Sequence, residues 1–276
     1  MLFLRNYAME RFLERLSASK YRNCFILKGG MLISAMVGID SRATMDIDTT
    51  LRNYPLNCES AEQIVRQIAD VEIDDKISFV IKKTEEIMED SEYQGVRLSL
   101  DAYLDKMRIP LKIDISTGDV ITPCEISFSY QLMFENRTIP LLAYPPETVL
   151  AEKLETILSR GEANTRLRDF YDVYILQRED FVVTPDALCH ALLATCRKRG
   201  HEDLLHTYAS ILDKVRQSDT MRTQWMKYQS DFDYAAGITW DTVLDTVETL
   251  CMKTLDDHAF GDELPQEESQ FEMHLL

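Results

Sequence analysis

The chain is 276 residues long, and 45% of its residues are hydrophobic while 28% are charged. This balance is typical of a globular protein that buries a core, and it excludes an intrinsically disordered chain. The 30 Lys and Arg residues are outnumbered by 47 Asp and Glu residues, which gives a formal net charge of -17. Because phosphate binding depends on Lys and Arg, this charge excludes a protein that coats nucleic acid non-specifically. Any contact with nucleic acid has to be local.

The cysteines and the first residues indicate a cytoplasmic protein. The six cysteines are widely spaced, with no Cys-x-x-Cys pair, so we expect reduced and mostly buried thiols. The first residues are charged and helix-periodic, without the apolar core and small-residue cleavage site of a signal peptide. No stretch approaches the ~18 consecutive apolar residues of a membrane span, so we expect no membrane partner.

The first half of the chain predicts a mixture of helices and strands. Residues 3–19 are expected to form an amphipathic helix, with Arg5, Arg11 and Arg15 off its apolar stripe. Gly29-Gly30 is expected to be a turn, followed by helices at 31–37 and, later, 59–70. Strand patterns occur at 24–27, 45–51, 77–82, 95–100, 110–116 and 125–133.

After the turn at 144–146 the strand patterns disappear. The helices expected there are 147–159, 166–177, 185–199, 202–216 and 239–253. The helix at 185 is the best delimited, because Thr184-Pro185 supplies an N-cap and Gly200 follows its basic last turn. With roughly 100–200 residues per domain, we expect domains at 1–145 and 146–255. Residues 256–276 hold seven acidic residues and no Lys or Arg, which predicts a disordered acidic tail.

Gly29-Gly30 and two aspartates indicate a phosphate and metal site. A Gly-Gly turn before a helix lets backbone amides approach an anion, although a purely structural turn has the same pattern. Asp46 and Asp48 are two apart in a predicted strand, so both carboxylates share one face while Ile47 points into the core. Such oxygen ligands suit Mg²⁺; a solvated turn or a salt-bridged strand end is the alternative.

A third carboxylate lies on a later predicted strand. In residues 111–116 apolar and polar residues alternate, so Asp114 leaves the core face of its strand. If this strand neighbours the Asp46–Asp48 strand, the three carboxylates could hold two metal ions roughly 3.5–4 Å apart, the arrangement that serves phosphoryl and nucleotidyl transfer. An ordinary solvent-facing residue is the alternative for Asp114 alone.

Several motifs together resemble a known family. They are Gly29-Gly30, Arg42-x-Thr44-x-Asp46-Ile-Asp48, the Asp114 strand Lys-Ile-Asp-Ile-Ser, Ala151-Glu-Lys153-Leu and Arg166-Leu-Arg-Asp169-Phe-Tyr-Asp172. In this order they resemble DNA polymerase β-like nucleotidyltransferases and, more closely, the AbiEii/AbiGii toxins of type IV toxin–antitoxin systems. The resemblance spans roughly residues 25–177. It implies an α/β (α+β) fold, with a mixed sheet followed by a helical C-terminal domain that completes the NTP site.

The resemblance also implies roles for these residues. It implies that a two-ion Mg²⁺ (or Mn²⁺) site is held by Asp46, Asp48 and Asp114. Lys153 and an aspartate, Asp169 or secondarily Asp172, would be needed for activity. The residues implied in nucleotide binding are Gly29, Gly30, Arg42, Thr44, Lys153 and Asp172. One departure is Gly30, where many members of the superfamily have Ser.

Helix geometry gives independent expectations for Lys153, Asp169 and Asp172. A stripe of apolar residues leaves Lys153 at a helix edge, unburied and able to meet a triphosphate. Asp169 and Asp172 are neighbours on an edge that we expect to be exposed, where Arg168 is placed to pair with Asp172.

These features predict an enzyme that transfers NMP from an NTP and releases pyrophosphate. The resemblance implies an RNA acceptor such as a tRNA 3′ end, with a protein side chain as the alternative, and a cognate antitoxin. Local phosphate contacts could come from Arg197-Lys198-Arg199 and from the basic N-terminal residues Arg5, Arg11, Arg15, Lys20, Arg22 and Lys28. Two other readings stay open: a nucleotide-sugar glycosyltransferase that uses Asp46-Ile-Asp48, and a nucleotide-binding regulator without turnover.

Overall fold

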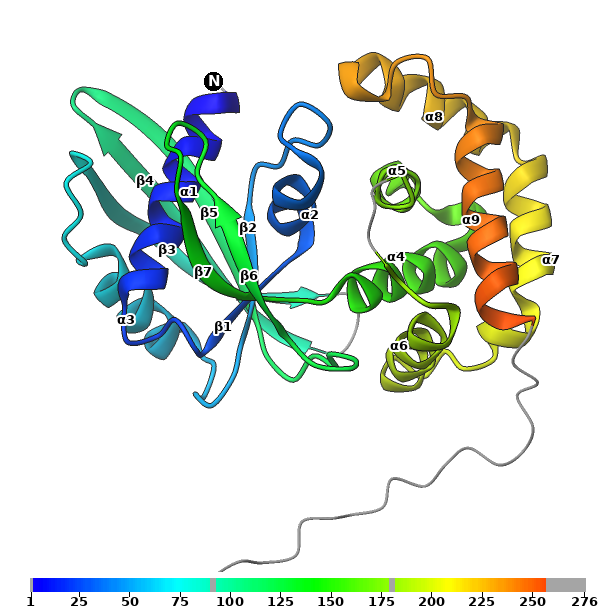
Figure 1. The fold of residues 1–276 in the computed structure, drawn as a ribbon, viewed down its shortest axis with the longest axis horizontal. Helices are drawn as coiled ribbons and strands as arrows, with labels where there is room; N and C mark the ends of the chain where they lie inside the picture. Colours follow the sequence, from blue (N-terminus) through cyan, green and yellow to red (C-terminus); the bar gives the residue numbers. More distant parts are fainter. Residues whose placement is uncertain (1, 90–92, 179–181, 257–276) are drawn as a thin grey trace, which may run out of the picture.

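The computed structural model describes residues 2–89, 93–178 and 182–256. A mixed seven-stranded sheet, in the order β3-β4-β5-β2-β1-β7-β6, forms one body with α1–α3, and the helices α4–α9 gather beside it (Figure 1). The strands are β1 (Phe25–Lys28), β2 (Ile47–Leu51), β3 (Ile77–Glu89), β4 (Tyr93–Leu104), β5 (Met107–Ser116), β6 (Ile126–Gln131) and β7 (Thr138–Ala143).

The helices fall into two groups along the chain. Those of the sheet body are α1 (Leu2–Ala18), α2 (Gly29–Val37) and α3 (Cys58–Ala69). Those of the helical body are α4 (Pro146–Arg160), α5 (Leu167–Leu176), α6 (Pro185–Lys198), α7 (Leu204–Gln217), α8 (Asp219–Asp231) and α9 (Trp240–Leu255). Helix α2 contacts α5, and this contact joins the two groups. The predicted fold class, a mixed sheet followed by helices, is therefore confirmed.

The strand register brings the predicted carboxylates together. Strand β2 runs parallel to β5, with Asp48 paired to Asp114, and antiparallel to β1, with Asp48 paired to Lys28. Alternation explains this arrangement, since Ile47 is fully buried while Asp48 on the opposite face is half-buried. The expectation that the Asp114 strand neighbours the strand of Asp48 is confirmed, whereas Asp46 lies just before β2 and not within it.

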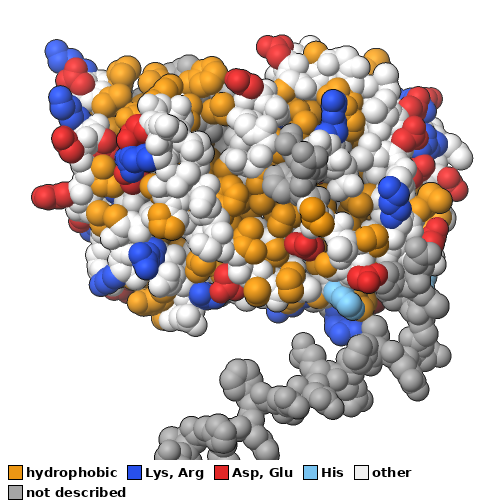
Figure 2. All heavy atoms as spheres, viewed as in Figure 1, with side chains coloured by type: hydrophobic (Ala, Val, Ile, Leu, Met, Phe, Trp, Pro, Cys, Tyr) orange, Lys and Arg blue, Asp and Glu red, His pale blue; other side chains and the backbone are white. Residues whose placement is uncertain are grey.

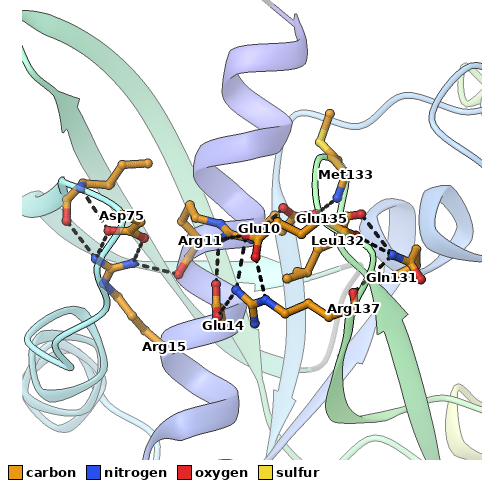
Figure 3. Close-up of polar contacts among 11 residues, drawn as sticks. Glu10, Arg11, Glu14, Arg15, Asp75, Gln131, Leu132, Met133, Glu135 and Arg137 are labelled. Carbon is orange, nitrogen blue, oxygen red and sulfur yellow. Dashed lines mark hydrogen bonds and ion pairs between the residues drawn. The ribbon is translucent and has the colours of Figure 1, made fainter.

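Helix α1 corrects one expectation. Arg11 and Arg15 were expected off the apolar stripe, but their side chains are only 2% and 3% exposed. Arg11 pairs with Glu10, Glu14 and Glu135, while Arg15 donates to both carboxylate oxygens of Asp75 at 2.6 and 2.8 Å (Figure 3). These carboxylates and the neighbouring strands cover the polar side of α1, so the arginines are buried as ion pairs.

Most elements lie where the sequence predicts them, and two were missed. Strand β7 contains Pro140, which interrupts a strand pattern, yet it pairs with both β6 and β1. Helix α8 is polar, and its buried side chains are only Met221, Trp225 and Tyr228. The N-cap at Thr184 is confirmed, because its side chain accepts a hydrogen bond from the Ala187 amide.

Two further expectations concern the cysteines and membranes. All six cysteines are free thiols, but only Cys189, Cys196 and Cys251 are buried, so burial holds for half of them. None of the helices in the described ranges is long and apolar enough to cross a membrane. The predicted acidic tail at 256–276 lies outside the described residues except for Asp256.

Candidate active site

A cavity of about 570 Å³ collects residues from the sheet body and from the helical body. It is lined by all of the predicted site residues except Asp172: Gly29, Gly30, Arg42, Thr44, Asp46, Asp48, Asp114, Lys153 and Asp169. Asp172 does not line the cavity, but its carboxylate forms ion pairs with Arg42 and Lys153, which do. Residues that are far apart in the sequence therefore meet at one site.

The Gly29-Gly30 segment forms the start of α2 and not a separate turn. Gly29 has a φ of +64°, and a Cβ there would lie 2.2 Å from Asp48 Oδ2, so only glycine fits. The Gly30 amide donates to Asp48 Oδ2 at 3.3 Å. Lys28, at the N-cap position, offers no side-chain cap to the first turn of α2. These first-turn amides line the cavity and are suited to an anion.

The neighbouring residue Thr44 explains why position 30 is Gly here, where many members of the superfamily have Ser. A Cβ on Gly30 would lie 2.6 Å from Thr44 Oγ1 and 3.2 Å from Thr44 Cβ. Thr44 is 4% exposed, so it has little room to move aside. The space that a serine side chain would need is therefore taken by Thr44.

The three carboxylates fit a divalent cation in donor type. Asp46, Asp48 and Asp114 are hard oxygen donors on one cavity. Both oxygens of Asp114, however, accept hydrogen bonds from Arg97, at 2.7 Å from Nε and 2.6 Å from Nη2. Consistent with this pairing, the described part of the chain has no cluster of three His, Cys, Asp or Glu residues arranged to hold a metal ion.

The carboxylates of α5 are buried, which corrects a second expectation. Asp169 is 1% and Asp172 0% exposed, whereas the sequence predicted an exposed edge. Asp172 accepts from Arg42 Nε at 2.6 Å and lies 3.1 Å from Lys153 Nζ, so the predicted pairing with Arg168 is wrong. Periodicity located the apolar stripe of α5 correctly but did not show that α4 and Arg42 cover the polar edge.

Lys153 is held between the two aspartates. Its Nζ donates to Asp169 Oδ1 at 2.6 Å, and its side chain is only 13% exposed. Burial alone lowers the pKa of Lys153, but the charges of Asp169 and Asp172 outweigh burial and raise that pKa above its ordinary value. Lys153 is therefore a fixed cation on the cavity wall, more buried than the sequence predicted.

The comparisons with known proteins agree with this geometry. The profile of the family described as "Nucleotidyl transferase AbiEii toxin, Type IV TA system" matches residues 11–246. The chain belongs to the AbiEii family. It is thus a nucleotidyltransferase of a type IV toxin–antitoxin system, which implies an NTP substrate and a cognate antitoxin. Membership decides against the glycosyltransferase and non-enzymatic readings.

Two solved structures are similar to this AbiEii-family chain. One is a crystal structure of JHP933 from Helicobacter pylori, with 14% identity and a TM-score of 0.49, covering 93% of this chain and 94% of that one. Another is an antigenic nucleotidyltransferase-like protein from Paracoccidioides brasiliensis, with 13% identity and a TM-score of 0.41, covering 72% of this chain and 90% of that one. No curated protein matches the sequence.

At this AbiEii-family site, sequence reasoning missed Asp119 and the burial of Lys28, which it had placed among the exposed phosphate contacts. Lys28 is 7% exposed, and its Nζ donates to Ser116 Oγ at 2.8 Å and to Asp119 Oδ2 at 3.1 Å. Lys28 directly precedes Gly29 and Ser116 ends the Lys-Ile-Asp-Ile-Ser strand, so proximity to both motifs was the available signal. Arg97 and Thr156 also line the cavity and had no such signal.

Proposed function

We propose that the protein is a metal-dependent nucleotidyltransferase that moves NMP from an NTP to RNA, in particular to a tRNA 3′ end, and releases pyrophosphate. The supporting observation is that Asp46, Asp48 and Asp114, the first-turn amides of α2 and Lys153 line a single cavity. This set offers negative charge for a cation and positive charge for phosphates at one place.

In the proposed reaction each group has a distinct role. Asp46, Asp48 and Asp114 would hold Mg²⁺ or Mn²⁺, which when bound polarises the phosphate and lowers the pKa of the attacking hydroxyl. For Asp114 this requires Arg97 to release the carboxylate. The amides of Gly29 and Gly30 bind phosphate oxygens. Lys153 neutralises charge on the departing pyrophosphate, and Asp169 and Asp172 fix its ammonium group in place.

The proposed division into two domains is based on which part of the chain supplies each site residue. The carboxylates and glycines belong to the segment 1–145, whereas Lys153, Asp169 and Asp172 belong to 146–255. We therefore infer that the helical domain completes the NTP site and that neither part is sufficient for turnover.

RNA is favoured as the acceptor by the cations around the cavity. Arg166, Arg168 and Arg199 line it, and Arg197 and Lys198 are exposed at the end of α6. Arg11 and Arg15 no longer belong to the proposed acceptor contacts, because they are buried in ion pairs with carboxylates.

The test is to incubate the protein with each α-labelled NTP, Mg²⁺ and total cellular RNA and protein. We expect label in small RNA, pyrophosphate release in equal amount, and loss of both with EDTA. Labelled polypeptide without labelled RNA would refute the RNA acceptor and favour protein modification.

A further inference from the structure

A second cavity, of about 520 Å³, lies between the start of α5 and α8. Arg166, Arg168 and Asp169 line both this cavity and the candidate active site. The opposite wall comes from the α8 region: Gln224, Lys227, Tyr228, Asp231 and Phe232. The two cavities are therefore adjacent, with these three residues between them.

Two buried side-chain oxygens of residues that line the second cavity lack hydrogen-bond partners among the described residues. Gln224 Oε1 is buried and has no hydrogen-bond partner, and Asp169 Oδ2 also lacks a hydrogen bond although Arg166 Nε lies 3.1 Å away. A buried acceptor without a partner is unfavourable unless a ligand supplies a donor. The side-chain amide of Gln224 is therefore suited to pair with a planar ligand that presents hydrogen-bond donors.

Three cationic side chains line this cavity, and one of them, Arg166, is paired with Asp169. Arg168 and Lys227 are exposed, and within the described ranges neither forms an ion pair with another residue. In a chain with a net charge of -17, cations left without a carboxylate partner beside a cavity indicate an anionic ligand. Phosphate groups attached to the planar ligand fit this requirement.

An aromatic cluster provides a fixed apolar surface on the α8 side. The rings of Tyr228 and Phe232 are 4.7 Å apart, and Phe232 also stacks on Tyr234 with centroids 5.3 Å apart. The hydroxyls of Tyr228 and Tyr234 are hydrogen-bonded at 3.1 Å, which holds the rings in place. Rigid aromatic surfaces next to amide and basic side chains are characteristic of nucleobase binding.

We propose that this second cavity binds a nucleobase, either that of the incoming NTP or that of the terminal nucleotide of the acceptor. Gln224 pairs with the edge of the base, Tyr228 and Phe232 contact it, and Arg168 and Lys227 contact its phosphates. The proposal rests on the proposed nucleotidyl transfer and adds to it a determinant of which nucleotide is used.

The test compares Gln224→Leu with Gln217→Leu, a matched change of an exposed glutamine at the end of α7, outside both cavities. Dissociation constants are measured for ATP, GTP, CTP and UTP without acceptor, and KM is measured for bulk tRNA. Gln224→Leu removes an unpaired buried acceptor, so its thermal stability should equal or exceed that of the wild type.

Two results support the proposal and distinguish the source of the base. If the cavity holds the NTP base, Gln224→Leu weakens binding of at least one NTP by about 10-fold and affects the four NTPs unequally. If it holds the acceptor base, NTP binding is unchanged and KM for tRNA rises about 10-fold. Gln217→Leu changes neither quantity.

Unchanged NTP binding and unchanged KM in Gln224→Leu would overturn the proposal. A wild-type protein that binds NTPs but labels no RNA would instead refute the RNA acceptor, and NTP binding alone would then decide the assignment of the cavity. In that case equal affinities of wild type and Gln224→Leu for all four NTPs would overturn it.

Discussion

Gly30 and Thr44 fill complementary space at the start of α2, and this contact can be tested directly. In Gly30→Ser the new Cβ would lie 2.6 Å from Thr44 Oγ1. Overpacking of a buried site costs about 1–3 kcal/mol, so we expect a lower melting temperature and weaker NTP binding. Thermal unfolding and equilibrium NTP binding measure the two effects.

The control for this change is the double variant Gly30→Ser/Thr44→Ala. It removes the oxygen at 2.6 Å and leaves Thr44 Cβ, at 3.2 Å, as the next neighbour. We expect it to regain at least half of the stability that Gly30→Ser loses. Simple addition of the two single effects would show that the contact with Thr44 is not the cause.

Lys153 tests how the phosphates are bound. In Lys153→Met the stem is kept and the ammonium group that contacts Asp169 and Asp172 is removed. A hydrogen bond to a charged group contributes about 1.5–3 kcal/mol, so we expect NTP affinity to fall about 10- to 100-fold and NMP affinity to change little. Equal losses for NTP and NMP, measured by titration, would mean that Lys153 supports the structure or binds the base.

At the scale of elements, the packing of α5 on α4 depends on buried charges. Burial alone raises the pKa of Asp172, but the charges of Arg42 and Lys153 outweigh burial and lower that pKa below the ordinary value of 3.8. A carboxyl group with a lowered pKa in the folded state stabilises the fold above its ordinary pKa, and this stability is lost as the pH falls toward the folded value.

Asp172→Asn should therefore change both the size and the pH dependence of stability. At pH 7 we expect a loss of about 3 kcal/mol, because Arg42 would remain buried without its carboxylate. As the pH falls below about 4 the difference from the wild type should shrink, because Asp172 of the wild type takes up a proton in the unfolded state before it does so in the folded state. Urea unfolding at several pH values measures this, and a difference that does not vary with pH would contradict the assigned pKa direction.

Sequence patterns predicted some of these elements and not others, for physical reasons. Alternation in β2 and β5 and the N-cap at Thr184 are local signals, and they located the carboxylates and α6 correctly. Periodicity shows which side of a helix is apolar, but it does not show what covers the polar side. For that reason the burial of Arg11, Asp169 and Asp172 could not be predicted.

At the scale of the whole molecule, the net charge of -17 restricts how RNA can bind. On the face in Figure 2, Lys and Arg side chains are scattered among Asp and Glu side chains and form no continuous basic surface. The RNA contacts proposed above are accordingly local. Transfer to RNA should fall steeply as salt rises, whereas NTP binding should fall less.

The exposed basic end of α6 tests this view. Arg197→Glu/Lys198→Glu should reduce transfer to RNA several-fold and leave NTP affinity unchanged, with Lys214→Glu on α7 as the control. Arg199 is left intact because it pairs with the buried Glu155. Equal transfer by the double variant and the control would remove this end of α6 from the acceptor surface.

The most direct test of the proposed function is the rate of pyrophosphate release from NTP in the presence of Mg²⁺ and RNA, compared between the wild type and Asp48→Asn. The substitution keeps the shape of a side chain that accepts from the Gly30 amide and removes its charge. We predict that release falls about 100-fold or more in Asp48→Asn while its melting temperature stays within a few degrees of the wild type. A folded Asp48→Asn protein that releases pyrophosphate at the wild-type rate would contradict the metal-dependent nucleotidyl transfer proposed for this site.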